Sequence, residues 1–421
     1  NRTLFKDIAL LPGGSIWTIP APSDIRKRQY FTPAMWSDQP LLDASQFETA
    51  FVKTMSDVLP TYFRSPNPVG LSLTGGLDTR ILTAGMPQDA KPAHAYTYAG
   101  IYRDCFDIRV ARDVANVCGV PHDVLGLQPD FFQDFESHAA ETVWVTDGTL
   151  DVCGAHEIYY SRQARALSPI RLTGNYGSEV LRSVSTFKPR APGAGLLDAD
   201  AARSADAAVG SFRDMRAGHP VTFAAFKEIP WNLYGRLAAA QSQLVLRSPY
   251  MDNALVELVY RAPAGSRETN EASLRLIAEM KPDLASIETD MAYGGRHASP
   301  VATLKRLSRY AQFKAEWYYN AGMPEWLARL DRTRALRLFE PLFLGSHKID
   351  HYRLWFQRQL KPYVQDLLTD ARSRARPYLD PHGFERLVSA HATGRGNCLN
   401  DLNKVMTLEL VHRQLLERHY D

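Results

Sequence analysis

Residues 69–82 constrain the fold more than any other stretch, because an apolar run meets a helix start there across two glycines. The run at 69–73 predicts a buried strand, and the apolar residues from Ile81 onward predict a helix. A strand, a glycine turn and a helix start form a geometry that binds phosphate, because the backbone can approach the anion and free N–H groups point at it. The stretch therefore predicts an anion-binding loop at residues 74–79.

The side chains of this loop add to the prediction. Thr74 and Thr79 can donate hydroxyl hydrogen bonds. Asp78 would repel a phosphate, so its presence indicates a bridging divalent cation such as Mg²⁺. The simpler interpretation is a glycine turn with Asp78 as a helix cap, and the residues alone leave both open. The glycine spacing matches neither a Walker loop nor a dinucleotide-binding fingerprint.

A second strand, glycine turn and acidic helix start follow at residues 170–179. A strand at 93–99 and a helix at 107–117 are also predicted, so strands and helices alternate as in a parallel α/β sheet. Such sheets bind ligands beyond the carboxyl ends of their strands. The two loops could therefore place Asp78 and Glu179 around one cation. The alternative for the second loop is a capped helix after a buried strand.

Apolar periodicity predicts further helices along the chain. They lie at 44–59, where Pro60 ends the pattern, in the second half of 141–160, at 226–259 with an interruption at 246–252, and over most of 300–421. Residues 187–219 are rich in Ala, Gly, Pro and Asp, which predicts a surface excursion near the site.

The loop at 74–79 resembles the pyrophosphate loop Ser-Gly-Gly-x-Asp-Ser of the N-type ATP pyrophosphatases, with Thr at both ends here. The surrounding chain resembles the synthetase domain of the asparagine synthetase family, which includes β-lactam synthetases and lasso-peptide cyclases. Residues 170–179 are similar to the family's Ser-Gly-Asp-Gly-x-Asp-Glu segment, and residues 247–252 are similar to its Arg-x-Pro-Phe-Leu-Asp element. The resemblance implies an α/β PP-loop fold of the adenine nucleotide α-hydrolase type: a parallel sheet flanked by helices, with a helical C-terminal region.

The resemblance also implies three units. Residues 1–45 are expected to be a remnant of an N-terminal glutaminase-like domain with a linker, 46–300 the ATP-pyrophosphatase synthetase domain, and 301–421 its helical C-terminal region. The chain begins at Asn1 without a Met, which is consistent with a fragment or a processed product. Asn1 is not the N-terminal Cys nucleophile of a glutaminase, so we expect ammonia to come from elsewhere.

Roles for individual residues follow from the resemblance. ATP is expected to contact Leu73, Thr74, Gly75, Gly76, Asp78, Thr79, Ala99, Thr173 and Gly174. Asp78 and Glu179 are expected to hold Mg²⁺. Tyr176 is expected to take part in catalysis, because the form Tyr-Gly-Ser-acid is closer to β-lactam synthetases. Arg296 is expected to replace a family Lys that stabilises developing negative charge, since residues 287–295 contain no Lys.

The chain departs from the family pattern at several positions. Asn175 and Ser178 stand where the family usually has Asp. Val245 stands two residues before the Arg of the 247–252 element, where the family often has a catalytic Glu. Val cannot act as a general base, and Glu228 is the nearest alternative acid along the sequence.

The implied activity is that of an AMP-forming carbon–nitrogen ligase of the asparagine synthase type. A carboxylate, with aspartate as the best candidate, attacks the α-phosphorus of ATP and releases pyrophosphate, and ammonia or an amine then gives the amide and AMP. Three alternatives stay open. Tyr176 favours an intramolecular cyclase of β-lactam or lasso-peptide type. Val245 and the missing Lys favour a catalytically degenerate nucleotide-binding protein. A sulfur-inserting adenylating transferase would need a reactive thiol near the loop, such as Cys105.

Composition limits the classes of partner that the chain is expected to bind. The net charge of +3 is too small to argue for nucleic acid or a membrane surface, and no apolar run approaches the roughly 20 residues that span a bilayer. No signal peptide is visible, and the four widely spaced cysteines predict reduced thiols in a cytoplasmic protein. The expected partners are a small-molecule or peptide carboxylate, an ammonia or amine donor and a separate glutaminase domain or chain.

Overall fold

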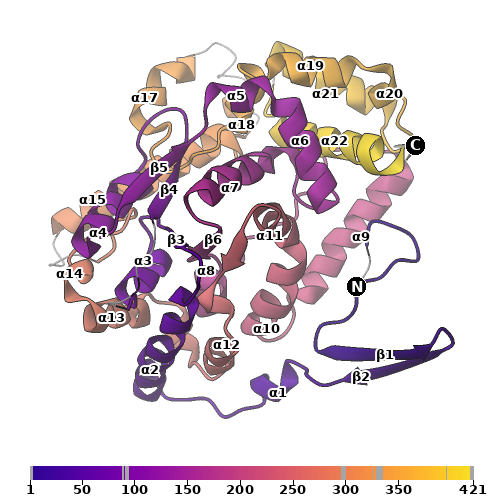
Figure 1. Ribbon diagram of the computed structural model, residues 1–421. Helices are drawn as coiled ribbons and strands as arrows, with labels where there is room; N and C mark the ends of the chain where they lie inside the picture. Colours follow the sequence, from indigo (N-terminus) through magenta and orange to yellow (C-terminus); the bar gives the residue numbers. More distant parts are fainter. Residues whose placement is uncertain are drawn as a thin grey trace.

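The computed structural model describes residues 3–87, 90, 94–294, 300–324, 326–328, 335–394 and 396–417. A five-stranded sheet with the order β5-β4-β3-β6-β7 lies at its centre, and every neighbouring pair is parallel (Figure 1). Its strands are β3 (Val69–Ser72), β4 (Ala95–Ala99), β5 (His122–Gly126), β6 (Ile170–Thr173) and β7 (Val245–Arg247). This confirms the predicted α/β class with a parallel sheet flanked by helices.

The strand order changes direction between β3 and β6. From β3 the chain continues to β4 and β5 on one side, and from β6 it continues to β7 on the other. Val69 pairs with Ile170 and Ser72 with Thr173, so both strands end at the same level. The two predicted glycine loops therefore leave the sheet side by side at a topological switch point, which is where ligands of open α/β sheets bind.

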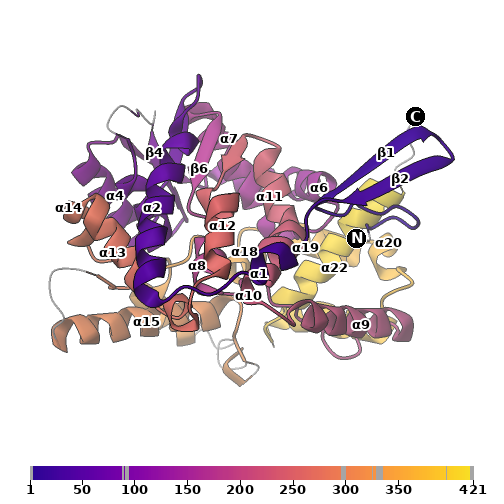
Figure 2. The same cartoon turned by 90° about the horizontal axis from the view of Figure 1, so that it is seen from below.

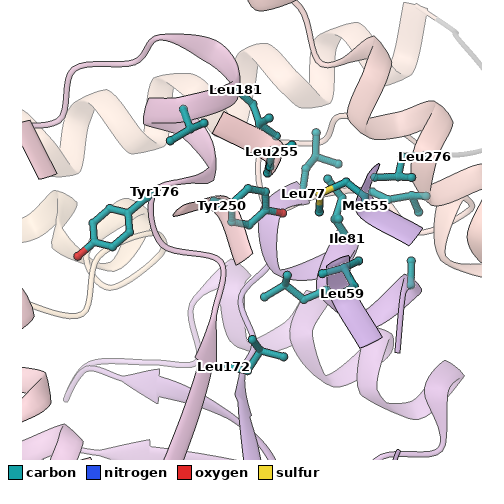
Figure 3. Packing of buried hydrophobic residues seen from close by; sticks show 14 of the residues in the cluster. Met55, Leu59, Leu77, Ile81, Leu172, Tyr176, Leu181, Tyr250, Leu255 and Leu276 are labelled. Carbon is teal, nitrogen blue, oxygen red and sulfur yellow. The ribbon is translucent and has the colours of Figure 1, made fainter. Parts of the chain in front are cut away.

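One face of the sheet packs on a large apolar core. Its helices are α2 (Ala44–Phe63), α3 (Leu77–Ala84), α4 (Phe106–Cys118), α8 (Gly177–Arg182), α12 (Asn253–Tyr260) and α13 (Glu271–Met280). In the close view of Figure 3, Met55, Leu59 and Ile81 meet Leu255 and Leu276. Helix α2 continues through Pro60 to Phe63, so its predicted end at residue 59 is wrong, because Leu59 and Phe63 are both buried and their packing holds the last turn.

The other face is covered by α6 (Phe135–Thr146), α7 (His156–Leu167) and α11 (Tyr234–Gln241) (Figure 1). A second apolar core joins α5 (Pro129–Gln133), α6 and α7 to the C-terminal helices. These are α18 (Tyr352–Gln357), α19 (Lys361–Thr369), α21 (Pro381–Thr393) and α22 (Leu399–Val411). The predicted helical C-terminal region is confirmed, and it packs directly on helices that flank the sheet.

Residues 3–43 contain a β-hairpin and a short helix. Strands β1 (Ser15–Ala21) and β2 (Asp24–Gln29) pair antiparallel, and the hairpin projects from the body in both views (Figures 1 and 2). The short helix α1 (Ala34–Ser37) follows. Within α1, the ring of Trp36 lies 6.0 Å from that of Phe226 and 6.2 Å from that of Tyr260, which attaches this segment to the body.

The remaining elements are mostly short. They are α9 (Ala199–Met215), α10 (Pro220–Phe223), α14 (Pro282–Ala285), α15 (Pro300–Asn320), α17 (Glu340–Phe343), α20 (Ala371–Arg374), η1 (Val152–Gly154), η2 (Ala224–Asn232), η3 (Pro249–Met251), η4 (Ala264–Arg267), η5 (Ala335–Phe339) and η6 (His412–Leu416). The sequence missed α6 and α9, and it treated the interruption at 246–252 as an irregular segment although β7 lies at its start.

Candidate active site

A cavity of about 530 Å³ opens at the carboxyl ends of β3, β4 and β6. Both glycine loops line it, together with residues near α11 and a C-terminal segment. The residues that bound it are Ser72, Leu73, Thr74, Gly76, Asp78, Thr79, Thr97, Tyr98, Asp107, Arg171, Thr173, Gly174, Asn175, Tyr176, Ser178, Glu179, Val184, Thr186, Leu233, Arg236, His347, Lys348, Ile349 and Asp350. Most residues assigned from the sequence therefore meet at one cavity.

The first loop is braced by its own hydroxyl groups. The Oγ1 atoms of Thr74 and Thr79 lie 3.1 Å apart, and the Thr74 N–H donates to the Thr79 hydroxyl at 3.1 Å. Gly76, not Asp78, is the N-cap of α3, and no side chain caps this helix end. The capping interpretation of Asp78 is therefore wrong, and the first-turn N–H groups of α3 are left for an anion.

Gly75 is not among the residues that line the cavity. Its N–H donates to Oδ1 of Asp107 at 2.7 Å, and a Cβ atom at this position would lie 2.7 Å from Cβ of Asp290. Burial and the neighbouring Asp290 raise the pKa of Asp107 to about 7. Asp107 lines the cavity, and sequence analysis placed it only as the start of a helix.

The second loop lies directly against the first. A Cβ atom on Gly174 would lie 2.7 Å from the methyl carbon of Thr79, and one on Gly177 would lie 2.5 Å from the carboxyl carbon of Asp78. Both positions thus require glycine for the two loops to meet. This close approach explains why two glycine turns occur at neighbouring strand ends.

Asp78 and Glu179 both line the cavity, as predicted. Nη2 of Arg182 donates to both oxygens of Asp78 at 2.8 Å, and the Ser178 hydroxyl donates to Oδ2 at 3.1 Å. The Thr186 hydroxyl donates to Oε1 of Glu179 at 2.5 Å. Across the described part of the chain, no three His, Cys, Asp or Glu side chains are grouped as a metal site. A cation here would need further ligands from its substrate or from water.

Tyr176 lines the cavity from the turn before α8. Its φ of 76° is a left-handed conformation that a bulky residue rarely adopts, and such strain is concentrated at functional sites. In Figure 3 its ring points away from the core residues Tyr250 and Leu255. Burial raises the pKa of Tyr176 to about 12, so near pH 7 the hydroxyl is protonated and can donate a hydrogen bond.

Among the described residues assigned from the sequence, Gly75 and Ala99 are not on the wall of the cavity. Ala99 ends β4 and is buried, and its carbonyl accepts a hydrogen bond from the Tyr160 hydroxyl at 2.7 Å. Its predicted adenine contact stays a prediction. Arg296 lies outside the described residues. Lys348, which sequence analysis did not single out, reaches the cavity from the C-terminal region together with His347.

The structure changes the interpretation of two further residues, Val245 and Cys105. Val245 pairs with Ile170, the first residue of β6, and is 57% exposed. It lies at the opposite end of the strands from the glycine loops, so its side chain says little about catalysis. Cys105 is buried, and burial raises the pKa of its thiol to about 11. Such a thiol is unreactive, which removes the support for a sulfur-inserting transferase.

Glu228 lies on η2 and is fully buried, so it does not line the cavity, but it is near Glu179, which does. Its Oε1 accepts from the Phe187 N–H at 2.8 Å and from the Ser185 hydroxyl at 3.0 Å, while its Oε2 is buried without a partner. Burial raises the pKa of Glu228, and the negative charge of Glu179 adds to the shift. The sequence indicated this residue only by its distance along the chain from Val245.

The model of the asparagine synthase family matches residues 59–278. This range is more than half of the chain and contains both glycine loops, β7 and the helices that pack against them. The chain belongs to the asparagine synthase family. Its members are ATP-dependent amide-forming ligases. The matched range contains both glycine loops of the cavity, whereas the lining residues His347, Lys348, Ile349 and Asp350 lie beyond it. No curated protein sequence matches the chain. Among the described helices, none combines the length and apolar character needed to cross a membrane.

Proposed function

We propose that this chain forms an amide bond at the expense of ATP, through an adenylated carboxylate. The observation that carries the proposal is the convergence on one cavity of two glycine loops, the uncapped N-terminus of α3 and the carboxylates Asp78 and Glu179. The ATP phosphates would bind to residues 74–79 and to Thr173 and Gly174. A substrate carboxylate would attack the α-phosphorus, and pyrophosphate would leave toward the N-terminus of α3.

Asp78 and Glu179 would hold Mg²⁺ together with the ATP phosphates. Their donor chemistry fits, because Mg²⁺ commonly binds one or two carboxylates and completes its shell with water and phosphate oxygens. When bound, the ion would neutralise charge on the leaving pyrophosphate. Arg182 would have to release Asp78 for the ion to bind, since it now occupies both carboxylate oxygens.

The chain's own residues would support amide formation. Lys348, on the cavity wall, would stabilise the oxyanion that forms when the amine attacks the acyl-adenylate, either in place of Arg296 or together with it. Glu228, behind the cavity wall, would accept the proton of the attacking amine through one bridging water, because its raised pKa brings it nearer to the working pH. Tyr176 would donate a hydrogen bond to the substrate from its strained turn.

The preferred substrate pair is aspartate with ammonia, which makes the chain an asparagine synthase. Ammonia would come from a glutaminase domain or a separate chain. A second candidate is an intramolecular cyclase of β-lactam or lasso-peptide type, and the position of Tyr176 on the cavity wall favours it. The third, a degenerate nucleotide-binding protein, loses one of its two arguments because Val245 is remote from the cavity.

Substrate-dependent exchange of labelled pyrophosphate into ATP tests the proposal. Wild-type protein should exchange with at least one carboxylic acid in a broad panel, and Asp78→Asn, which keeps the shape but not the charge, should not. Aspartate with ammonia should then give asparagine and AMP if the first substrate pair is correct. ATP binding without exchange for any acid would overturn the ligase proposal in favour of a nucleotide-binding protein.

A further inference from the structure

The cavity contains a buried guanidinium that the proposed ATP contacts do not use. Arg171 is 6% exposed, yet it lines the cavity. Its Nε is buried without a partner, and the contact found for its guanidinium is the ring of Tyr98, with 5.1 Å between Cζ and the ring centroid. Among the described residues, the side chain of Arg171 forms no hydrogen bond or ion pair, and the carboxylate of Glu157 acts on its charge without such a contact.

The strand pattern explains where this side chain lies. Ile170 and Leu172 of β6 join the core with α2, so Arg171 between them points to the opposite face, which α7 covers. Tyr98 of β4 lies on the same side. The guanidinium is therefore beside the ring of Tyr98 and beneath the strand ends, and not at the loop of residues 74–79.

The nearby carboxylate is already engaged. Oε1 of Glu157, on α7, lies 3.0 Å from Nε of Arg236, which also lines the cavity. Arg236 is thus paired with Glu157. The other charged residues on this side of the cavity are the cations Arg171 and Lys348 and the anion Asp350. Arg171 therefore shares the charge of Glu157 with Arg236 and has no hydrogen-bonded anion of its own. An incompletely paired buried charge is unfavourable, so Arg171 is best explained as a receptor for an anion that arrives with a ligand.

We propose that Arg171 binds a carboxylate of the substrate other than the one that reacts with ATP. The inference rests on the proposed function and names its specificity determinant: the substrate has two carboxylates, one at the α-phosphorus and one on Arg171. A guanidinium presents paired N–H donors that match the two oxygens of a carboxylate. Leu233 and Ile349, on the same cavity wall, help to exclude water from this contact.

The test compares matched acids in the pyrophosphate-exchange assay. Each dicarboxylic acid (succinate, glutarate, aspartate and glutamate) is paired with the monoamides that keep its shape and lack one charge. Wild-type protein should reach half-maximal exchange at about tenfold to hundredfold lower concentration of the diacid than of its best monoamide. Arg171→Met should reduce this ratio to about one, and Arg171→Lys should restore part of it.

Two controls separate a substrate contact from a phosphate contact and from misfolding. The affinity for ATP should stay within about twofold in Arg171→Met, whereas an equal loss of ATP affinity would assign Arg171 to the nucleotide. Met removes a buried charge at similar length, so the variant should fold and melt at or above the wild-type temperature. Arg26→Met, in the exposed hairpin, should leave the exchange kinetics unchanged.

Thermal shift with succinate in the absence of ATP distinguishes failure of the anion site from failure of the ligase activity. Stabilisation that depends on Arg171, without exchange for any acid, would support the anion site while the ligase proposal fails. Exchange in which monoamides perform as well as diacids would overturn the anion site while the ligase proposal stands.

Discussion

Arg182 donates from Nη2 to both carboxylate oxygens of Asp78, at 2.8 Å each. The pair joins the start of α3 to the end of α8, so it ties together the two glycine loops at the switch point. Each side chain is 17% exposed, and the contact is therefore shielded from bulk water. The proposed metal ligand thus has a built-in competitor.

Replacing Arg182 tests this competition. We expect Arg182→Met to lower the Mg²⁺ concentration that gives half-maximal exchange by about fivefold, which corresponds to about 1 kcal/mol of lost competition. Arg182→Lys keeps the charge and should change this Mg²⁺ concentration less. Titration of Mg²⁺ in the exchange assay measures the effect. An increased Mg²⁺ requirement would instead mean that Arg182 holds Asp78 in position for the metal.

Gly177 should be essential for the site and dispensable for the helix. Alanine in α8 would favour the helix by about 0.5–1 kcal/mol, but its Cβ would lie 2.5 Å from the carboxyl carbon of Asp78. We expect Gly177→Ala to displace Asp78 and to weaken ATP–Mg²⁺ binding by tenfold or more, measured by calorimetry. In Gly210→Ala the new Cβ meets nothing within 4 Å, so this control should bind normally. Normal binding by Gly177→Ala would contradict the close packing of the two loops.

The pH dependence of stability should report on Asp107. Its pKa is raised to about 7 by burial and by Asp290, whereas an unfolded Asp titrates near pH 4. Between these values the folded state binds a proton that the unfolded chain has released, so stability falls as the pH rises from about 4 to about 7. In Asp107→Asn the amide oxygen can still accept from the Gly75 N–H, and the stability of this variant should fall less over the same pH range. Its unfolding free energy at pH 8 should exceed that of wild type by on the order of 2 kcal/mol. Urea unfolding from pH 5 to pH 8 measures this, and parallel curves for the two proteins would refute it.

The sequence predicted those parts of the site that depend on local geometry. Each glycine loop is contiguous with its strand and helix, so its residues reveal the strand, the turn and the exposed helix N-terminus without knowledge of the rest. The adjacency of β3 and β6 was a hypothesis, because the sequence shows where each strand ends but not which strands are neighbours; the strand order confirms it. Gly174 and Gly177 also have a second role, against Thr79 and Asp78, that only the packed loops reveal.

The parts that sequence reasoning missed depend on contacts between distant segments. Lys348 follows the last glycine-loop residue by about 170 positions and has no motif of its own, so only the packing of the C-terminal region brings it to the cavity. Strand β7 has three residues and no clear alternation. Arg171 lies between the apolar Ile170 and Leu172 of β6, and that interruption was the available signal for a functional residue on the α7 face.

Lys348 should act in the chemical steps rather than in ATP binding. We expect Lys348→Met to reduce the rate of amide formation by about 10²–10³-fold, as when one oxyanion donor is lost, while ATP affinity changes little. Lys348→Arg should recover part of the rate, since it keeps the charge. Single-turnover formation of AMP and product measures the step. An unchanged rate in Lys348→Met, with a large loss in Arg296→Met, would support the sequence-based assignment instead.

Glu316 is the anchor of the segment that carries Lys348. It is fully buried, and its carboxylate accepts from the N–H groups of Gly345 at 2.6 Å and His347 at 2.8 Å, and lies 2.7 Å from Nε2 of His351. Glu316→Ala would leave these buried donors without an acceptor, so we expect a loss of about 3 kcal/mol in unfolding free energy. Glu316→Gln keeps one acceptor oxygen and should lose less.

The functional consequence of Glu316 separates positioning from simple stability. If the carboxylate holds the loop in register, Glu316→Gln should lower kcat for amide formation several-fold at a temperature where the variant is fully folded, with ATP affinity within about twofold of wild type. Lys348→Met combined with Glu316→Gln should then be no slower than Lys348→Met alone, because both act through the same ammonium group. Additive losses in the double variant would show that Glu316 supports the site by another route, such as the position of His347.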